Sequence, residues 1–239
     1  MSEAEIVRMN AILNRQRSAF MAALPEPISL RRDRLARAIA LLVDHGEEFA
    51  RAVSADFGHR SETQTMLTDI LPSVSALKDA KRHCASWAKA ERRKPMAPLG
   101  LLGARARVDY QPKGVVGVIA PWNFPVGMVM APMAGILAAG NRAMIKPSEF
   151  TERVASLLAQ LVPQYFAEEE MAVVTGGADI GAAFAGLPFD HLIFTGATGV
   201  GRKIMAAAAD NLVPVTLELG GKSPVIIGRS ANMAQAGER

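Results

Sequence analysis

Two patterns of hydrophobic and polar positions divide the chain. Up to about residue 94, apolar residues recur at helical intervals, as at Leu35, Ile39 and Leu42, and this spacing predicts helices with one buried face. From Arg105 onward, short runs rich in Val and Ile alternate with longer segments of helical periodicity. That alternation is typical of βα units that build a parallel sheet. The order of segments predicts a doubly wound, Rossmann-like α/β fold with an all-helical lead-in.

The predicted elements are short and closely spaced after residue 105. Core strands are expected at 115–120, 143–146, 172–175, 191–195 and 215–219, with another strand starting at 225–227. Helices are expected near 127–139, 151–166, 179–186 and 199–210. Residues 105–111 alternate between apolar and polar, which indicates an edge or hairpin strand. Prolines and glycines in 94–103 predict a linker or a sharp redirection. Ser2 with Glu5, and Ser61 with Gln64, have the spacing of helix capping boxes.

Composition and charge exclude several classes of protein. The 239 residues are 50% hydrophobic and 21% charged, which is ordinary for a globular protein and excludes a disordered or collagen-like chain. The formal net charge is +4, but basic and acidic residues are interspersed, so we expect no nucleic-acid partner. The densest basic runs, at 31–34 and 92–94, are interpreted as solvated surfaces on or beside helices.

Cysteine usage and hydropathy indicate the compartment. One cysteine cannot form an internal disulfide, and no Cys/His spacing suggests a metal site, so we expect a reducing, cytoplasmic environment and no metal. Charged residues interrupt 1–24, which excludes the apolar core of a signal peptide. The uncharged stretch 114–141 contains three prolines, so it predicts a buried strand and helix rather than a membrane span.

Candidate chemistry lies in the loops after the predicted strands, because ligands bind at the carboxyl ends of strands in open α/β sheets. The loop Pro-Trp-Asn-Phe-Pro at 121–125 presents the amide of Asn123 between two prolines. An equally weighted interpretation is a rigid turn in which Asn123 satisfies local backbone groups. The next loop, Lys-Pro-Ser-Glu, places Lys146 beside Glu149, a pair that suits a ribose or a phosphate. The alternative there is a helix start capped by Ser148 and favoured by the acid.

Two further loops carry glycines. One is a turn that opens a helix with bare backbone N–H groups able to approach a pyrophosphate, and it reads Gly196-Ala197-Thr198-Gly199-Val200-Gly201. Its order departs from the usual G-x-G-x-x-G, and glycines placed for tight strand-to-helix packing are the alternative. The other loop places Glu218 at a strand end before two glycines. A carboxylate there can serve as a general base, although a surface glutamate at a turn has the same pattern.

The four loops occur in one order: Gly-Val-Val-Gly-Val-Ile-Ala-Pro-Trp-Asn-Phe-Pro, Lys-Pro-Ser-Glu, Phe-Thr-Gly-x-Thr-Gly-x-Gly and Leu-Glu-Leu-Gly-Gly-Lys-Ser-Pro. In this order and approximate spacing they resemble the aldehyde dehydrogenase superfamily, over nearly the whole chain. Residues 138–141, 163–165 and 189–191 look most like its class 3 branch. Residues 56–60 and the helical lead-in are similar to bacterial coniferyl aldehyde dehydrogenases within that branch.

The resemblance implies a role for each loop. Asn123 would donate its amide to the oxyanion of a tetrahedral intermediate, and Glu218 would activate the water that hydrolyses the thioester. Lys146 and Glu149 would bind the adenosine ribose, with Trp122 also at the cofactor. The turn from Gly196 through Ala197, Thr198, Gly199 and Val200 to Gly201 would lie under the pyrophosphate of NAD or NADP. Ala197 stands where many relatives have Ser, which leaves the choice between NAD and NADP open.

The resemblance also implies a division of the chain. Residues 1–104 would be a helical lead-in that packs on an NAD(P)-binding domain at 105–228, and 229–239 would begin a catalytic domain. The family's cysteine nucleophile lies after the Glu-Leu-Gly-Gly motif, where only 21 residues remain (239 − 218) and none is Cys. Cys84 lies in the lead-in, and we interpret it as an inert, half-buried helix thiol. We therefore expect either a portion of a longer enzyme or a frameshifted or shortened gene product, in both cases with exposed apolar surface and poor solubility.

Two functions from different classes follow. The first is oxidation of an aldehyde, with coniferyl or another aromatic aldehyde as the candidate substrate, to its acid. An intact enzyme that resembles class 3 dimers would carry this out, with this chain inactive alone. The second is a nucleotide-binding module without catalysis. A related reductase that acts on acyl phosphates is a third interpretation, and Glu218 argues against it because such relatives do not generally need a glutamate base.

Overall fold

The computed structural model describes residues 2–237 and has a five-stranded parallel sheet at its centre, with strand order β5-β4-β3-β6-β7. The strands are β3 (Val115–Ile119), β4 (Arg142–Lys146), β5 (Met171–Val173), β6 (His191–Gly196) and β7 (Val215–Leu219). The connecting helices are α6 (Gly127–Ala139), α7 (Glu152–Tyr165), α8 (Ala178–Ala185) and α9 (Thr198–Ala209). The predicted doubly wound α/β fold is confirmed, and these elements lie within a few residues of their predicted bounds.

Helices precede the sheet, as the apolar periodicity predicts. They are α1 (Glu3–Ala22), α2 (Ile28–Asp44), α3 (Gly46–Phe57), α4 (Glu62–Thr65), the π-helical turn η1 (Met66–Ile70) and α5 (Leu71–Trp87). The capping box of Ser2 and Glu5 is present, and the Ser61 hydroxyl accepts a hydrogen bond from the Gln64 N–H. None of the described helices is long and apolar enough to cross a membrane.

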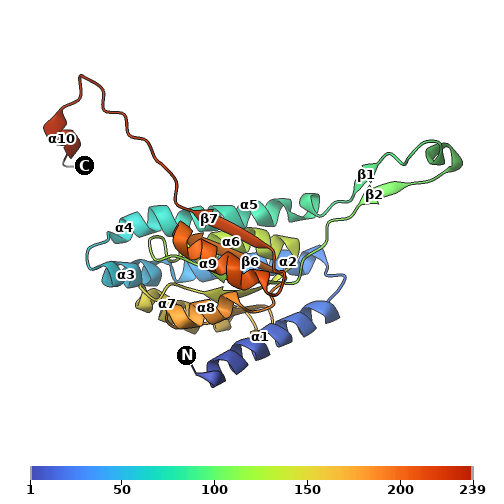
Figure 1. Cartoon of the computed structure of the whole chain (residues 1–239), viewed down its shortest axis with the longest axis horizontal. Coiled ribbons are helices and arrows are strands. Elements are labelled where there is room, and N and C mark those ends of the chain that lie inside the picture. Colours follow the sequence, from blue (N-terminus) through green and yellow to red (C-terminus); the bar gives the residue numbers. More distant parts are fainter. Residues whose placement is uncertain (1, 238–239) are drawn as a thin grey trace.

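Strand side chains alternate between two hydrophobic cores, one on each face of the sheet. Val116 and Val118 of β3 join the core formed with α2, α3, α5, α6 and α7. Val115 of the same strand joins the core formed with α1, α8 and α9. Because successive strand residues point to opposite faces, a strand with near-continuous apolar residues is buried on both sides. In Figure 1, α5 lies above the strands, and α8 and α1 lie below them.

Residues 88–110 form a two-stranded antiparallel ribbon that projects from the body (Figure 1). Strand β1 (Glu91–Arg93) pairs with β2 (Ala106–Val108), and the turn between them contains the short helix η2 (Leu99–Leu102). The hairpin strand predicted at 105–111 is confirmed. The interpretation of 92–94 as helix-associated is wrong, since 92 and 93 lie in β1, although their side chains are exposed.

The strand predicted to start at 225–227 is wrong. Residues 220–230 have no helix or strand, and the chain runs from β7 away from the body to the short helix α10 (Met233–Gly237) (Figure 1). Val225 and Ile226 are 83% and 93% exposed. A strand needs a neighbour for its backbone hydrogen bonds, and no described segment lies beside this one. The expected exposure of apolar surface is confirmed, whereas poor solubility remains a prediction.

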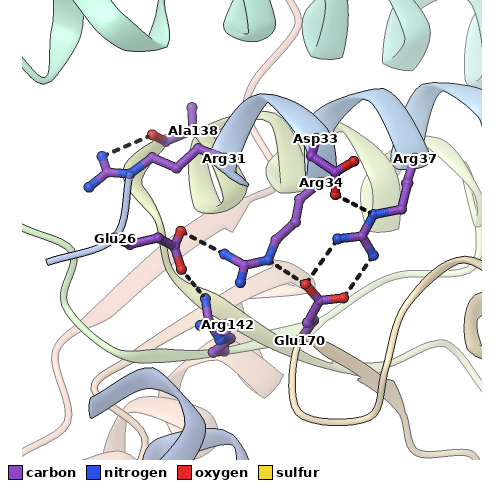
Figure 2. A network of polar contacts seen from close by, with 8 residues as sticks. All are labelled: Glu26, Arg31, Asp33, Arg34, Arg37, Ala138, Arg142 and Glu170. Carbon is purple, nitrogen blue, oxygen red and sulfur yellow. Dashed lines mark hydrogen bonds and ion pairs between the residues drawn. The ribbon is translucent and has the colours of Figure 1, made fainter. Parts of the chain in front are cut away.

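A buried ionic network replaces the solvated face predicted for 31–34. Arg32 and Asp33 are exposed, but Arg31 and Arg34 are only 8% and 2% exposed. Figure 2 shows Glu26 between the guanidinium groups of Arg34 and Arg142, at 2.6 and 2.8 Å. The composition of 31–34 does not reveal this burial, because the acidic partners of Arg34 are Glu26 and Glu170, which lie in the loops before α2 and β5. The network ties the helical lead-in to the sheet.

Glu170 lies at the other end of this network, where it contacts Arg34 and Arg37 (Figure 2). Its pKa gives the stability of the fold a pH dependence. Burial raises the pKa of Glu170, but hydrogen bonds from Arg37 and Arg34 outweigh burial and lower the pKa from 4.5 to about 2. A carboxyl whose pKa is lower in the folded state stabilises the fold above its unfolded pKa and loses that contribution as pH falls.

We expect the free energy of unfolding that Glu170 contributes to be fully present above about pH 4.5 and lost between pH 4.5 and 2. Urea unfolding of the wild type and of Glu170→Gln, from pH 7 to the lowest pH at which both fold, measures this contribution. The difference in stability between the two proteins should shrink as pH falls. A difference that stays constant or grows would contradict the assignment.

Candidate functional site

The site lies where the direction of strand addition reverses. β3 is central, paired with β4 on one side and β6 on the other, both in parallel. The chain proceeds from β3 outward to β5 and then returns to β6. Loops at the carboxyl ends of β3 and β6 therefore diverge, which leaves a crevice where α/β proteins bind ligands.

Two cavities occupy this crevice and share Pro121, Trp122, Thr195, Gly196 and Ala197. The lysine cavity, of about 520 Å³, also contains Lys146, Ser148, Glu149, Val200 and Lys203. The asparagine cavity, of about 800 Å³, also contains Asn123, Thr198, Glu218 and Gly220. Both volumes lie in the range of small-molecule and cofactor pockets, about 300–1,000 Å³. All four predicted loops therefore meet at one end of the sheet.

Lys146 and Glu149 are brought together in the lysine cavity. Lys146 is the last residue of β4 and only 2% exposed. Its Nζ donates to the Pro147 carbonyl at 2.8 Å and lies 3.2 Å from Glu149 Oε2. Ser148 accepts a hydrogen bond from the Phe150 N–H rather than capping α7, which begins at Glu152. The cap alternative for Ser148 is thus not what the structure shows, and the charged pair faces a cavity.

The three glycines of the 196–201 turn have different structural reasons. A Cβ at Gly196 would lie 2.6 Å from the Phe194 ring, and one at Gly201 would lie 2.8 Å from Leu219. Packing therefore explains these two. A Cβ at Gly199 would meet nothing within 4 Å, and packing does not explain its glycine. It lies on an open surface.

The start of α9 offers backbone donors at that open surface. The N-cap residue is Ala197, which gives no side-chain cap, and the first hydrogen bonds to its carbonyl come from Val200 and Gly201. The N–H groups of Thr198 and Gly199 precede those bonds. Free N–H groups at a helix N-terminus bind anionic groups such as phosphate. This turn therefore offers backbone donors of the kind that bind an anionic group.

The 121–125 loop presents Asn123 to the asparagine cavity. Asn123 is exposed, and its side-chain amide makes no hydrogen bond within residues 2–237. The alternative in which this amide satisfies local backbone is therefore wrong. Trp122 is 51% exposed and borders both cavities. An amide without a partner at the end of a rigid loop is available to a ligand.

Two charged residues of the lead-in hold this loop, and the sequence reasoning missed them. Arg60 donates to the Asn123 carbonyl and pairs with Asp69 at 3.1 Å, with both side chains buried. Burial raises the pKa of Asp69, while the Gly127 N–H and Arg60 act in the opposite direction. The sequence signal was weak because 63 residues separate Arg60 from Asn123.

Glu218 stands beside Thr195 in the pairing of β7 with β6, and it lies on the exposed edge of the sheet. It borders the same cavity as Asn123. Its exposure is compatible with a general base that reaches a water molecule and with a surface glutamate. Cys84, by contrast, is 1% exposed within α5 and lies outside both cavities, so it is fully buried rather than half-buried.

Comparison with known proteins identifies this arrangement. The coniferyl aldehyde dehydrogenase of Pseudomonas sp. (strain HR199) is 56% identical over 232 residues, which cover 97% of this chain and 47% of that protein. A probable coniferyl aldehyde dehydrogenase of Caulobacter vibrioides is 55% identical over 239 residues, or 100% of this chain and 49% of that protein. The chain thus spans about half the length of the curated relatives it matches.

Solved structures agree with this result. A substrate-bound structure of Staphylococcus aureus AldH superimposes with a TM-score of 0.87 at 33% identity, over 96% of this chain and 50% of that one. A mutant of Pseudomonas syringae AldA, an indole-3-acetaldehyde dehydrogenase, in complex with NAD⁺ and IAA has a TM-score of 0.80 at 27% identity, over 92% of this chain and 44% of that one. A sequence model of the aldehyde dehydrogenase family matches residues 1–239. The chain belongs to the aldehyde dehydrogenase family.

Proposed function

We propose that this chain supplies the NAD(P) site, the oxyanion donor and the general base of an enzyme that oxidises coniferyl aldehyde or another aromatic aldehyde to its acid. The observation that carries the proposal is that Asn123 and Glu218 border one cavity, which meets the lysine cavity at the Gly196–Ala197 turn. The names of the relatives at 55–56% identity support the substrate class.

The residues of the turn and of the lysine cavity fit a dinucleotide. The N–H groups of Thr198 and Gly199 would hold the pyrophosphate, and the Lys146–Glu149 pair would hold the hydroxyls of the adenosine ribose. Trp122 borders both cavities and would contact the cofactor between them. When bound, NAD(P)⁺ supplies the acceptor for the hydride that leaves the substrate.

The asparagine cavity fits the chemistry at the aldehyde carbon. The family's cysteine would attack the aldehyde, and the Asn123 amide would donate a hydrogen bond to the oxygen that becomes negative. After the hydride has left, a thioester links substrate and cysteine. Glu218 would then take a proton from water as its oxygen attacks that carbonyl, which releases the acid and the thiolate.

This function is tested by supplying the remaining half. A chimera of residues 1–239 with the part of the Caulobacter vibrioides relative that follows the matched region should form NADH or NADPH from coniferyl aldehyde. The 239-residue chain alone should not. Steady-state turnover by the chain alone, or a folded chimera without turnover, would contradict the proposal.

Gly199→Val in the 239-residue chain is expected to weaken NAD⁺ binding by about tenfold or more, equivalent to roughly 1.4 kcal/mol. Added methyl groups would occupy the open surface over which the pyrophosphate passes, without a clash in the free protein. Calorimetry gives the affinity, and thermal unfolding checks the fold. Gly135→Val, also in open space but in α6, is the matched control. Equal affinity in both variants would contradict the placement of the pyrophosphate.

A nucleotide-binding module without catalysis is the second candidate. It is favoured by the location of Cys84, the one cysteine in these 239 residues, which is buried in α5 away from both cavities. Titration of the chain with NAD⁺ and NADP⁺ also compares the two cofactors. Lys146 would attract a 2′-phosphate and Glu149 would repel it, so the two affinities report which charge dominates.

The same proposal includes the domain bounds, the compartment and the oligomeric state. Residues 1–104 would pack on a cofactor-binding domain at 105–228, and 229–239 would begin the catalytic domain. The intact enzyme would be a cytoplasmic homodimer. A relative named as a dimeric NADP-preferring aldehyde dehydrogenase, from Canis lupus familiaris, is 32% identical over 228 residues and supports the dimer.

A further inference from the structure

The loop that carries Asn123 is held by a residue outside the sheet. Arg60 lies three residues after α3 ends, and its side chain is 7% exposed. One terminal nitrogen donates to the Asn123 carbonyl. The other lies 3.1 Å from Asp69 Oδ2 and 3.2 Å from Thr68 Oγ1. The guanidinium group therefore spans the gap between the loop and the π-helical turn η1.

Two aromatic rings contact the same guanidinium group. Its carbon lies 5.1 Å from the centre of the Phe57 ring and 4.9 Å from that of Phe124. The Phe57 ring also lies 5.9 Å from the Trp122 ring. Three consecutive loop residues, Trp122 to Phe124, are thus held by the Phe57 ring and Arg60. Stacking and hydrogen bonding together suit the planar arginine group better than a lysine ammonium.

Asp69 anchors the far end of the same segment. Its Oδ1 accepts a hydrogen bond from the Gly127 N–H at 2.7 Å, where α6 begins. Asp69 is 0% exposed. The Arg60–Asp69 pair therefore fixes the peptide of Asn123 on one side and the start of α6 on the other, while the Asn123 side chain faces the asparagine cavity.

We infer that Arg60 is a positioning residue for Asn123: it fixes the backbone from which the side-chain amide reaches the asparagine cavity, before substrate arrives. The inference rests on the proposed function. A donor placed in advance stabilises a developing oxyanion without a cost of reorganisation. Arg60 does not touch the substrate, so its loss should affect the reaction through the order of Asn123.

The 239-residue chain provides the direct test. In a sample with ¹⁵N-labelled asparagine, the backbone amide signal of Asn123 is assigned by its disappearance in Asn123→Ala, and its heteronuclear NOE reports the order of the loop backbone. Arg60→Met should lower the heteronuclear NOE of this backbone signal, and Arg60→Lys should give an intermediate value. If Arg60→Met does not fold, Arg60→Lys decides, because it keeps the charge opposite Asp69. Arg51→Met and Arg51→Lys, at an exposed position of α3, are the matched controls.

Activity and cofactor affinity separate this role from general stability. In the chimera described above, Arg60→Met should lower kcat by about a hundredfold, with KM little changed, and Arg60→Lys should restore part of the loss. NAD⁺ affinity of the chain should remain near that of the wild type. Ordered Asn123 signals in the folded Arg60 variants, or a kcat equal to that of the Arg51 controls, would overturn the inference.

The proposed function fails in a different way. If Asn123→Ala leaves kcat unchanged, or the wild-type chain does not bind NAD⁺, the oxyanion or cofactor assignment is wrong. If Asn123→Ala lowers kcat while both folded Arg60 variants do not, only the positioning role of Arg60 is wrong.

Discussion

Replacing Glu218 by Gln in the chimera is expected to lower steady-state turnover by about 10²–10⁴-fold while the first turnover still forms NADH. Glutamine has the shape of glutamate but cannot accept a proton from water. Because the hydride leaves before water attacks, only hydrolysis of the thioester should slow. Stopped-flow absorbance should therefore show a burst close to one NADH per site, followed by a very slow phase.

Glu169→Gln is the control for this experiment, since Glu169 is an exposed glutamate outside both cavities. It should leave both phases unchanged. A Glu218→Gln enzyme that turns over like the wild type would show that Glu218 is a surface glutamate, as its exposure also allows. If both the burst and steady-state turnover are lost, Glu218 acts in a step that precedes hydride transfer. That result would contradict its assignment to thioester hydrolysis.

Replacing Glu26 by Ala is expected to lower the free energy of unfolding by about 3–5 kcal/mol, because it leaves buried charges without their partner. Glu26 is paired with both Arg34 and Arg142, and all three side chains are no more than 3% exposed. Arg34 would retain Glu170, but Arg142 would retain no acidic partner within the described residues. Urea unfolding followed by circular dichroism measures the change.

Glu168→Ala provides the comparison for Glu26. Glu168 pairs with Arg15 at the surface, with 38% and 60% of the two side chains exposed. Such a pair is worth up to about 1 kcal/mol, so its loss should be small. If Glu26→Ala destabilises the chain no more than Glu168→Ala, water reaches the buried network and its assigned role in stability is wrong.

Much of the site could be predicted because it depends on local features. Each candidate loop follows an apolar run, and parallel strands bring all their carboxyl ends to one edge. That rule places Asn123, Lys146, Gly196 and Glu218 together without knowledge of side-chain contacts. The order of strands along the sheet was not predicted, since it depends on pairings between distant segments.

The wrong predictions concern residues whose structure depends on contacts with residues far away in the sequence. Arg34 looked like part of a solvated basic run, and its acidic partners Glu26 and Glu170 lie 8 and 136 residues away. Strand β1 is charged and short, and only its pairing with β2 makes it a strand. The apolar run 225–227 has the composition of a strand but no partner among the described residues. Arg60 was missed for the same reason, since nothing in its neighbourhood points to Asn123.

Every role proposed for these residues requires that this chain forms a nucleotide site by itself. Calorimetric titration of the 239-residue chain with NAD⁺ and NADP⁺, on a sample shown to be folded by circular dichroism, tests it most directly. We predict saturable binding of one nucleotide per chain, weakened by Gly199→Val and unchanged by Gly135→Val. A folded sample that gives no heat with either nucleotide at millimolar concentration would contradict the claim.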